Sequence, residues 1–140
     1  MSSADPTLLA RIFAQCHTIA VVGLSADTSR ASFGVARYLQ AAGFRIVPVN
    51  PRYAGQAILG EPCYATLADI PFAVDVVDVF RRAEDMLPIA EEAVAIRAKC
   101  FWQQLGIANH EADALVRAAG LDSVFDRCTK IDHAWLSRQP

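Results

Sequence analysis

The stretch Thr18–Gly34, T-I-A-V-V-G-L-S-A-D-T-S-R-A-S-F-G, decides the fold of this chain. It begins with apolar, mostly β-branched residues, breaks at Gly23, passes through small polar residues and re-enters an apolar helical pattern at Ser32. That order predicts a buried strand, a loop and the start of a helix. A helix N-terminus has unpaired N–H groups and partial positive charge, so it favours anions. The stretch therefore predicts a loop that can hold a phosphate group.

Strand and helix patterns alternate along the rest of the chain. We expect strands over residues 18–22, 44–49, 74–80, 100–104 and 123–126. We expect helices over residues 32–42, 83–98 and 109–119, with a lead-in helix that Asp5 and Pro6 begin and that ends near Cys16. Residues 53–72 are rich in glycine and proline and predict a crossover with a short extended piece at 57–59 and a helical turn at 67–70. The tail, residues 127–136, is expected to form a final helical turn or two.

This alternation predicts an α/β fold, a Rossmann-like doubly wound parallel sheet of about five strands with helices on both faces. We expect the strand order 3-2-1-4-5, with the loop after Val22 at the point where the order reverses. The length of 140 residues suits one domain over residues 1–140. Ligands of such sheets bind outside the carboxyl ends of the strands, so the residues that follow each strand are the candidate site.

Composition excludes several classes of function. Apolar residues make up 54% of the chain and charged residues 20%, which is enough for a packed core. The net charge is −2 and no run of Lys or Arg occurs, so we expect no nucleic-acid partner. No apolar stretch approaches the ~20 residues that span a bilayer, and the first six residues lack the pattern of a secretory signal. We therefore expect a cytoplasmic protein that does not bind membranes.

The residues after the first and second expected strands indicate which nucleotide the protein binds. An NAD-binding domain would carry G-x-G-x-x-G after the first strand and an acidic residue after the second. Here one glycine, Gly23, stands at the turn, the next lies eleven residues further on, and the second strand closes on Asn50-Pro51-Arg52. A cation at that place suits a phosphate on the ribose. The pattern disfavours NAD and favours coenzyme A or NADP.

The first loop offers groups that can bind phosphate. It contains the guanidinium of Arg30 and the hydroxyls of Ser25, Thr28, Ser29 and Ser32. Hydroxyls and helix-end amides donate to phosphate oxygens, and arginine adds charge-assisted hydrogen bonds. The alternative is a solvated serine-rich turn in which Ser32 caps the helix.

Three arginines follow strand ends on the same expected edge of the sheet. Arg52, Arg81 and Arg82 would be brought together there by the fold, which favours binding of an anionic ligand. The alternative is that one of Arg81 and Arg82 pairs with Glu84, Asp85 or Asp78. Phe80 would either pack against an adenine or cap the core.

The sequence carries none of the common catalytic motifs. No G-x-S-x-G, H-E-x-x-H or Walker A pattern occurs, and none of the three histidines is placed beside a nucleophile. Asp75 and Asp78 fall on opposite faces of their strand, so they do not form a carboxylate pair. We expect no catalytic residue and no metal site.

The four cysteines form no C-x-x-C pair. We expect Cys16, Cys63 and Cys100 to be packed free thiols. Cys128 has basic neighbours, which lower the pKa of a thiol. It is either a packed thiol or, if coenzyme A binds nearby, a thiol able to form a mixed disulfide with it.

Seven sequence blocks resemble the small single-domain CoA-binding proteins, which are similar to the CoA-binding domain of the succinyl-CoA synthetase alpha subunit. The blocks are V-V-G-L-S (21–25), S-F-G-V-A-R-Y-L (32–39), G-F-R-I-V-P-V-N-P (43–51), A-G-Q-A-I-L-G (54–60), V-D-V-V-D-V-F-R-R (74–82), W-Q-Q-L-G-I (102–107) and D-R-C-T-K-I-D-H (126–133). They cover nearly the whole chain after Cys16. The family often has a proline where this chain has Asp27-Thr28.

The resemblance implies a Rossmann-type domain that binds coenzyme A and a set of twelve binding residues. Gly23, Ser25, Arg30 and Ser32 would face the phosphates, and Asn50, Pro51 and Arg52 would border the adenosine 3′-phosphate. Val79, Phe80 and Arg81 would border the adenine and ribose, and the turn from Gln104 to Gly106 would lie toward the pantetheine arm.

The function expected is therefore binding of coenzyme A or a short acyl-CoA by a non-catalytic or regulatory module. The alternatives are an NADP-linked oxidoreductase and a structural partner subunit with a vestigial pocket. A protein partner or a second copy of the chain is left open.

Overall fold

The fold is known from a computed structural model, which describes residues 4–140. Its main sheet is a five-stranded parallel sheet, as the sequence predicts. The strands are β1 (Thr18–Val22), β2 (Arg45–Val49), β5 (Val76–Val79), β6 (Cys100–Gln103) and β7 (Asp122–Val124). A separate antiparallel pair, β3 (Ala57–Ile58) and β4 (Glu61–Pro62), lies in the crossover between β2 and β5.

Residues 4–140 form five α-helices and three short 3₁₀ turns, with one helix before the first strand and one after the last. The helices are α1 (Pro6–Gln15), α2 (Ala31–Ala41), α3 (Met86–Ala95), α4 (His110–Ala118) and α5 (Thr129–Ser137). The turns are η1 (Pro51–Tyr53), η2 (Leu67–Asp69) and η3 (Ala83–Asp85). The helical tail is longer than the turn or two expected, and the expected helix 83–98 divides into η3 and α3. Asp5 caps α1 as predicted, since its carboxylate accepts the Leu8 N–H at 2.9 Å.

The sheet has the order β2-β1-β5-β6-β7, so the predicted order 3-2-1-4-5 is wrong. The third main strand, β5, pairs with β1 and not with β2. The crossover itself occupies the outer edge of β2, because the Tyr64 N–H donates to the Pro48 carbonyl at 3.0 Å and the Asn50 N–H donates to the Tyr64 carbonyl at 2.9 Å. The chain must then return on the other side of β1. The reversal point falls between β1 and β5, so the loop after Val22 still lies at the switch point.

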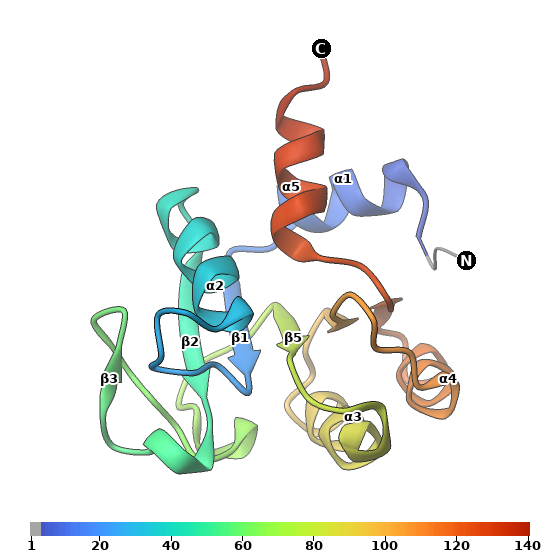
Figure 1. Cartoon of the computed structure of the whole chain (residues 1–140). Helices are drawn as coiled ribbons and strands as arrows, with labels where there is room; N and C mark the ends of the chain where they lie inside the picture. The colour runs from blue at the N-terminus through green and yellow to red at the C-terminus, as the bar shows by residue number, and fades with distance from the viewer. Residues whose placement is uncertain (1–3) are drawn as a thin grey trace.

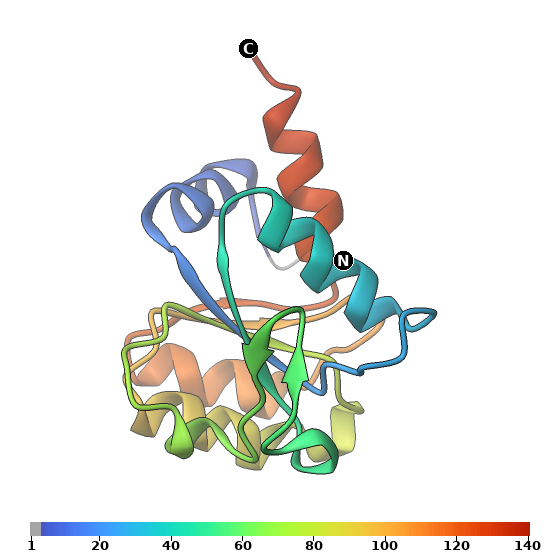
Figure 2. The same cartoon turned by 90° about the vertical axis from the view of Figure 1, so that its left-hand side faces the viewer.

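Helices cover both faces of the sheet (Figure 1). α1, α2 and α5 lie on one face, and α3 and α4 lie on the other, which Figure 2 shows from the side. Alternate residues of β1 enter the two cores: Ile19 and Val21 pack toward the first layer, Ala20 and Val22 toward the second. A strand buried on both faces needs a continuous apolar run, which is what the opening stretch contains. Within residues 4–140 no helix is both long and apolar enough to cross a membrane.

Candidate functional site

The turn after β1 brings three strand ends close together. Gly23 has a φ of +87°, and its N–H donates to the Val49 carbonyl of β2 at 2.8 Å. On the other side, the Phe80 N–H donates to the Val22 carbonyl at 2.8 Å. A Cβ atom on Gly23 would overlap the backbone carbonyl of Phe80. Position 23 therefore requires glycine for both its backbone angle and its close approach to β5.

Hydrogen bonds within the loop fix its path into α2. The Ser25 N–H donates to Ser32 Oγ at 3.1 Å, and the Asp27 N–H donates to Ser25 Oγ at 3.0 Å. Asp27 Oδ1 accepts from both the N–H and the hydroxyl of Ser29, and these bonds lower the pKa of Asp27. Arg30 and not Ser32 is the N-cap of α2. These hydrogen bonds of Ser25, Asp27 and Ser32 fix the loop against the N-terminus of α2.

Asn50 joins the ends of β1, β2 and β5. Its side chain is buried, and Nδ2 donates to the Leu24 carbonyl at 3.1 Å. Oδ1 accepts the Arg52 N–H at 3.0 Å and Arg81 Nη2 at 3.4 Å. Asn50, one of the predicted contact residues, therefore fixes the backbone at Arg52 and accepts a hydrogen bond from the guanidinium of Arg81.

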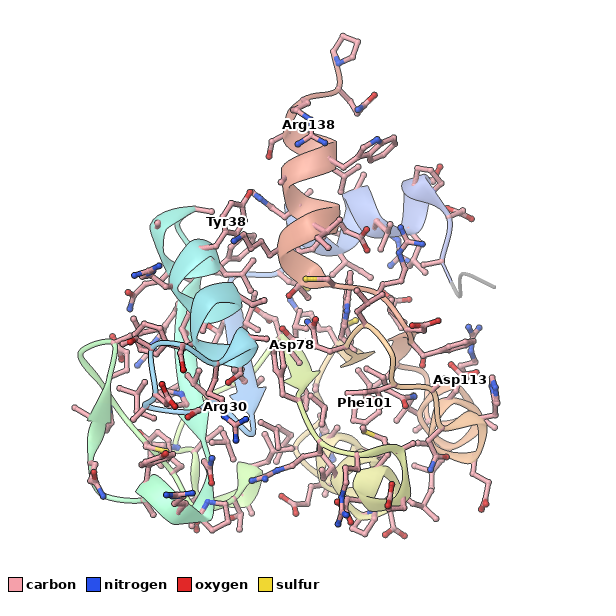
Figure 3. The ribbon with its side chains drawn as sticks, viewed as in Figure 1. Arg30, Tyr38, Asp78, Phe101, Asp113 and Arg138 are labelled. Atoms are coloured by element: carbon pink, nitrogen blue, oxygen red, sulfur yellow. The ribbon has the colours of Figure 1, made fainter. Side chains whose placement is uncertain are left out.

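These strand ends surround a cavity of about 410 Å³, called here the first cavity. The Gly23 turn, the start of α2, the end of β2 and the end of β5 line it. Figure 3 labels Arg30, the N-cap of α2, among these residues. Its lining is Gly23, Ser25, Arg30, Ala31, Ser32, Asn50, Arg52, Tyr53, Phe80 and Arg81. In this set three side chains are guanidinium groups and none is a carboxylate. Such a cavity suits a ligand that carries several negative charges.

Arg81 and Arg82 have different partners. Arg82 forms ion pairs with Asp85 at 3.2 Å and with Glu84 at 3.7 Å, so the expectation that one of the pair Arg81 and Arg82 meets an acidic neighbour is confirmed. Arg81 instead donates from Nη2 to Asn50 Oδ1, and both residues line the first cavity. Arg52 is exposed, with its guanidinium over the ring of Tyr53.

A second cavity of about 750 Å³ adjoins the first, because Phe80 and Arg81 line both. It extends along residues 80–85 to Gly106 and Ile107. Asp126 fixes this far wall: Oδ1 accepts the Gly106 N–H at 2.7 Å, and the Asp126 N–H donates to the Ile107 carbonyl at 2.9 Å. The two cavities together form a groove from the end of β2 to the turn after β6.

A family model and a sequence relative each match most of this chain. The family model described as "CoA binding domain" matches residues 17–134. The chain belongs to this CoA-binding domain family. A Bacillus subtilis (strain 168) relative, "Uncharacterized protein YneT", is 36% identical over 134 residues, which are 96% of this chain and 98% of that protein.

Solved structures extend the comparison. Cell-free ID.343 from Thermus thermophilus shares 37% identity at a TM-score of 0.91, covering 95% of this chain and 99% of that one. A dinucleotide-forming acetyl-coenzyme A synthetase from Ca. Korarchaeum cryptofilum gives a TM-score of 0.66 at 24% identity, over 76% of this chain and 25% of that one. The synthetase shares the fold, and the Thermus thermophilus structure matches this chain over nearly its full length.

Three of the twelve predicted contact residues do not line either cavity. Val79 is fully buried in the core, because β5 is covered on both faces. Gln104 is also buried, and Pro51 lines a separate small cavity beneath the sheet edge. Tyr53 lines the first cavity although the sequence did not single it out; its place one residue after Arg52 was the available signal.

The buried side chain of Gln104 forms a polar cluster with Asp78 and Thr129 inside the CoA-binding domain. Its Nε2 donates to Asp78 Oδ1 at 2.6 Å and to Thr129 Oγ1 at 2.9 Å, and Thr129 Oγ1 donates to Asp78 Oδ2 at 3.0 Å. Thr129 begins α5, so the cluster links the sheet to that helix. Burial raises the pKa of Asp78 to about 7, although the bonds from Gln104 and Thr129 act in the opposite direction.

This buried carboxyl group predicts a pH-dependent stability. An unfolded chain releases the Asp78 proton near pH 4 and the folded chain near pH 7, so between these values the folded state holds the extra proton. The free energy of unfolding should therefore fall by about 1–2 kcal/mol as the pH rises from 5 to 7. Urea unfolding of the wild type and of Asp78→Asn at both pH values measures it. The variant should lack this fall, and an equal fall in both proteins would contradict the assignment.

The cysteines are free in the structure, as expected. Cys16, Cys63 and Cys100 are buried, and desolvation raises the pKa of all three thiols. Cys128 is half-buried at the N-cap of α5. Among residues 4–140 no group of three or more His, Cys, Asp or Glu side chains is placed to hold a metal ion.

Proposed function

We propose that this protein binds coenzyme A or a short acyl-CoA at the carboxyl edge of its sheet, as a non-catalytic or regulatory module. One observation carries the proposal: three guanidinium groups and the N-terminus of α2 line a cavity at the switch point that has no carboxylate in its lining. Coenzyme A carries a diphosphate and a 3′-phosphate, which need several cationic or N–H donors in one place. Membership of the CoA-binding domain family supports the same ligand.

The arrangement of the lining gives the ligand a direction. The Gly23 turn, Ser32 and the first N–H groups of α2 would receive the diphosphate, since helix N-termini leave such groups without intrahelical partners. Arg52, at the β2 side, would meet the 3′-phosphate, with Tyr53 as the neighbouring aromatic ring for the adenosine. Phe80 and Arg81 border both cavities, so they would contact the middle of the ligand. The pantetheine arm would then enter the second cavity.

The same geometry supports a binding role over a redox role. His17, His110 and His133 line neither cavity, and Asp78, the strongly perturbed acid, is fully buried away from both. The side chains that line the first cavity offer anion binding and no obvious general base. A cytoplasmic location remains a prediction from the sequence, which leaves open whether a protein partner or a second copy of the chain binds.

Titration calorimetry with coenzyme A, dephospho-CoA and NADPH separates the proposal from its alternatives. We expect coenzyme A to bind, dephospho-CoA to bind more weakly, and NADPH to give no measurable heat. Tight NADPH binding with no response to coenzyme A would contradict the proposal and favour an NADP-linked enzyme. Silence with all three ligands would favour a structural subunit whose pocket is vestigial.

A further inference from the structure

The second cavity has an uneven distribution of charge. Its wall contains Glu84 and Asp85, which share a single guanidinium, that of Arg82. Arg82 Nε lies 3.2 Å from Asp85 Oδ2, and its Nη1 lies 3.7 Å from Glu84 Oε2. The other cation of this cavity, Arg81, is directed toward Asn50 and the first cavity. With Arg81 directed there, the two carboxylates of the second cavity have one guanidinium between them, which leaves an excess of negative charge in this cavity.

The remaining walls of the second cavity are apolar and fixed. Phe80, Ala83 and Ile107 supply them. The Ala83 carbonyl accepts Asn109 Nδ2 at 2.8 Å, and Asp126 holds the turn at Gly106 and Ile107 from behind, which adds another carboxylate near this wall. Walls held by such bonds change little in size when a ligand enters.

We infer that the second cavity accepts short uncharged acyl groups and discriminates against acyl groups that end in a carboxylate. The inference rests on the proposed function, because it needs the bound ligand to engage Arg81 in the first cavity. Once it does, a terminal carboxylate in the second cavity meets Glu84 and Asp85 with only Arg82 between them. An uncharged chain meets Phe80 and Ile107 with no such penalty.

Butyryl-CoA and succinyl-CoA are a matched pair of probes, since both acyl groups have four carbons and differ in a terminal methyl or carboxylate. Two like charges about 4 Å apart in water repel by about 1 kcal/mol, so we expect succinyl-CoA to bind roughly three- to tenfold more weakly than butyryl-CoA. Because these side chains are exposed, the difference should shrink as ionic strength rises. Calorimetry of the full chain with both thioesters and with coenzyme A measures it.

Variants assign the effect to its residues. The double substitution Glu84→Gln and Asp85→Asn should abolish or reverse the preference, because it leaves Arg82 unpaired, while the affinity for butyryl-CoA stays within about twofold. Glu91→Gln on α3, an exposed carboxylate that lines neither cavity, is the control and should keep the preference. Two results would overturn this inference and leave the proposed function standing. In the first, the protein binds coenzyme A but binds butyryl-CoA and succinyl-CoA with equal affinity. In the second, the double variant keeps the preference for butyryl-CoA. No binding of coenzyme A or either thioester would overturn the proposed function and the inference with it.

Discussion

Gly23→Ala should lower the free energy of unfolding by about 2–4 kcal/mol and should abolish ligand binding. The added Cβ would overlap the Phe80 carbonyl, a backbone atom that cannot rotate away. The φ of +87° at this position adds strain for any residue with a side chain. Relief of the overlap requires the end of β5 to move from β1, which would displace Phe80 and Arg81 from the cavities. Urea unfolding and calorimetry with coenzyme A measure the two effects.

Gly34→Ala is the matched control for this prediction. Gly34 lies within α2, its φ is helical, and a Cβ there would meet no atom within 4 Å. Alanine is the better helix former, so this change should raise the free energy of unfolding by about 0.5–1 kcal/mol. We therefore expect Gly23→Ala to lower the free energy of unfolding and Gly34→Ala to raise it. A stable, ligand-binding Gly23→Ala protein would contradict the account of the switch point.

Arg52→Ala should weaken the binding of coenzyme A by roughly ten- to a hundredfold and change the binding of dephospho-CoA by less than twofold. The reason is the loss of one charge-assisted contact with the 3′-phosphate, worth about 1.5–3 kcal/mol. Arg52 is exposed and forms no ion pair in the described part of the chain, so its removal should leave the stability unchanged. Calorimetry of both ligands with both proteins gives the full comparison.

Arg37→Ala controls for the general effect of lost positive charge. Arg37 is exposed on α2, near the ring of Phe33, and lines neither cavity. We expect this variant to bind both ligands as the wild type does. Equal losses of coenzyme A and dephospho-CoA affinity in Arg52→Ala would reject the assignment of Arg52 to the 3′-phosphate.

Much of the fold could be predicted because the signals are local. The apolar run of β1, the Asp5-Pro6 start of α1 and the Asn109 cap of α4 each act within a few residues. The strand order could not be predicted in the same way. It depends on the crossover after Asn50, where Tyr64 occupies the outer edge of β2, and this long-range pairing has no periodic signal in the sequence.

The candidate site too could be predicted only in part. The rule that ligands bind at strand ends placed Gly23, Arg52 and Arg81 at one edge, and the structure brings them into one cavity. The rule cannot say which side chains at an edge face outward. Gln104 was expected to face the ligand and instead bonds Asp78 and Thr129, because α5 packs over it, and only the three-dimensional position of α5 reveals this.

A crystal structure of the protein with coenzyme A would show where each part of the ligand binds. We expect the diphosphate at the Gly23 turn and the N-terminus of α2, the 3′-phosphate at Arg52, and the pantetheine arm to pass Phe80 into the second cavity. Electron density for the ligand elsewhere, for example in the separate cavity that Leu9 of α1 and Trp135 of α5 line, or a 3′-phosphate remote from Arg52, would contradict the proposed binding site.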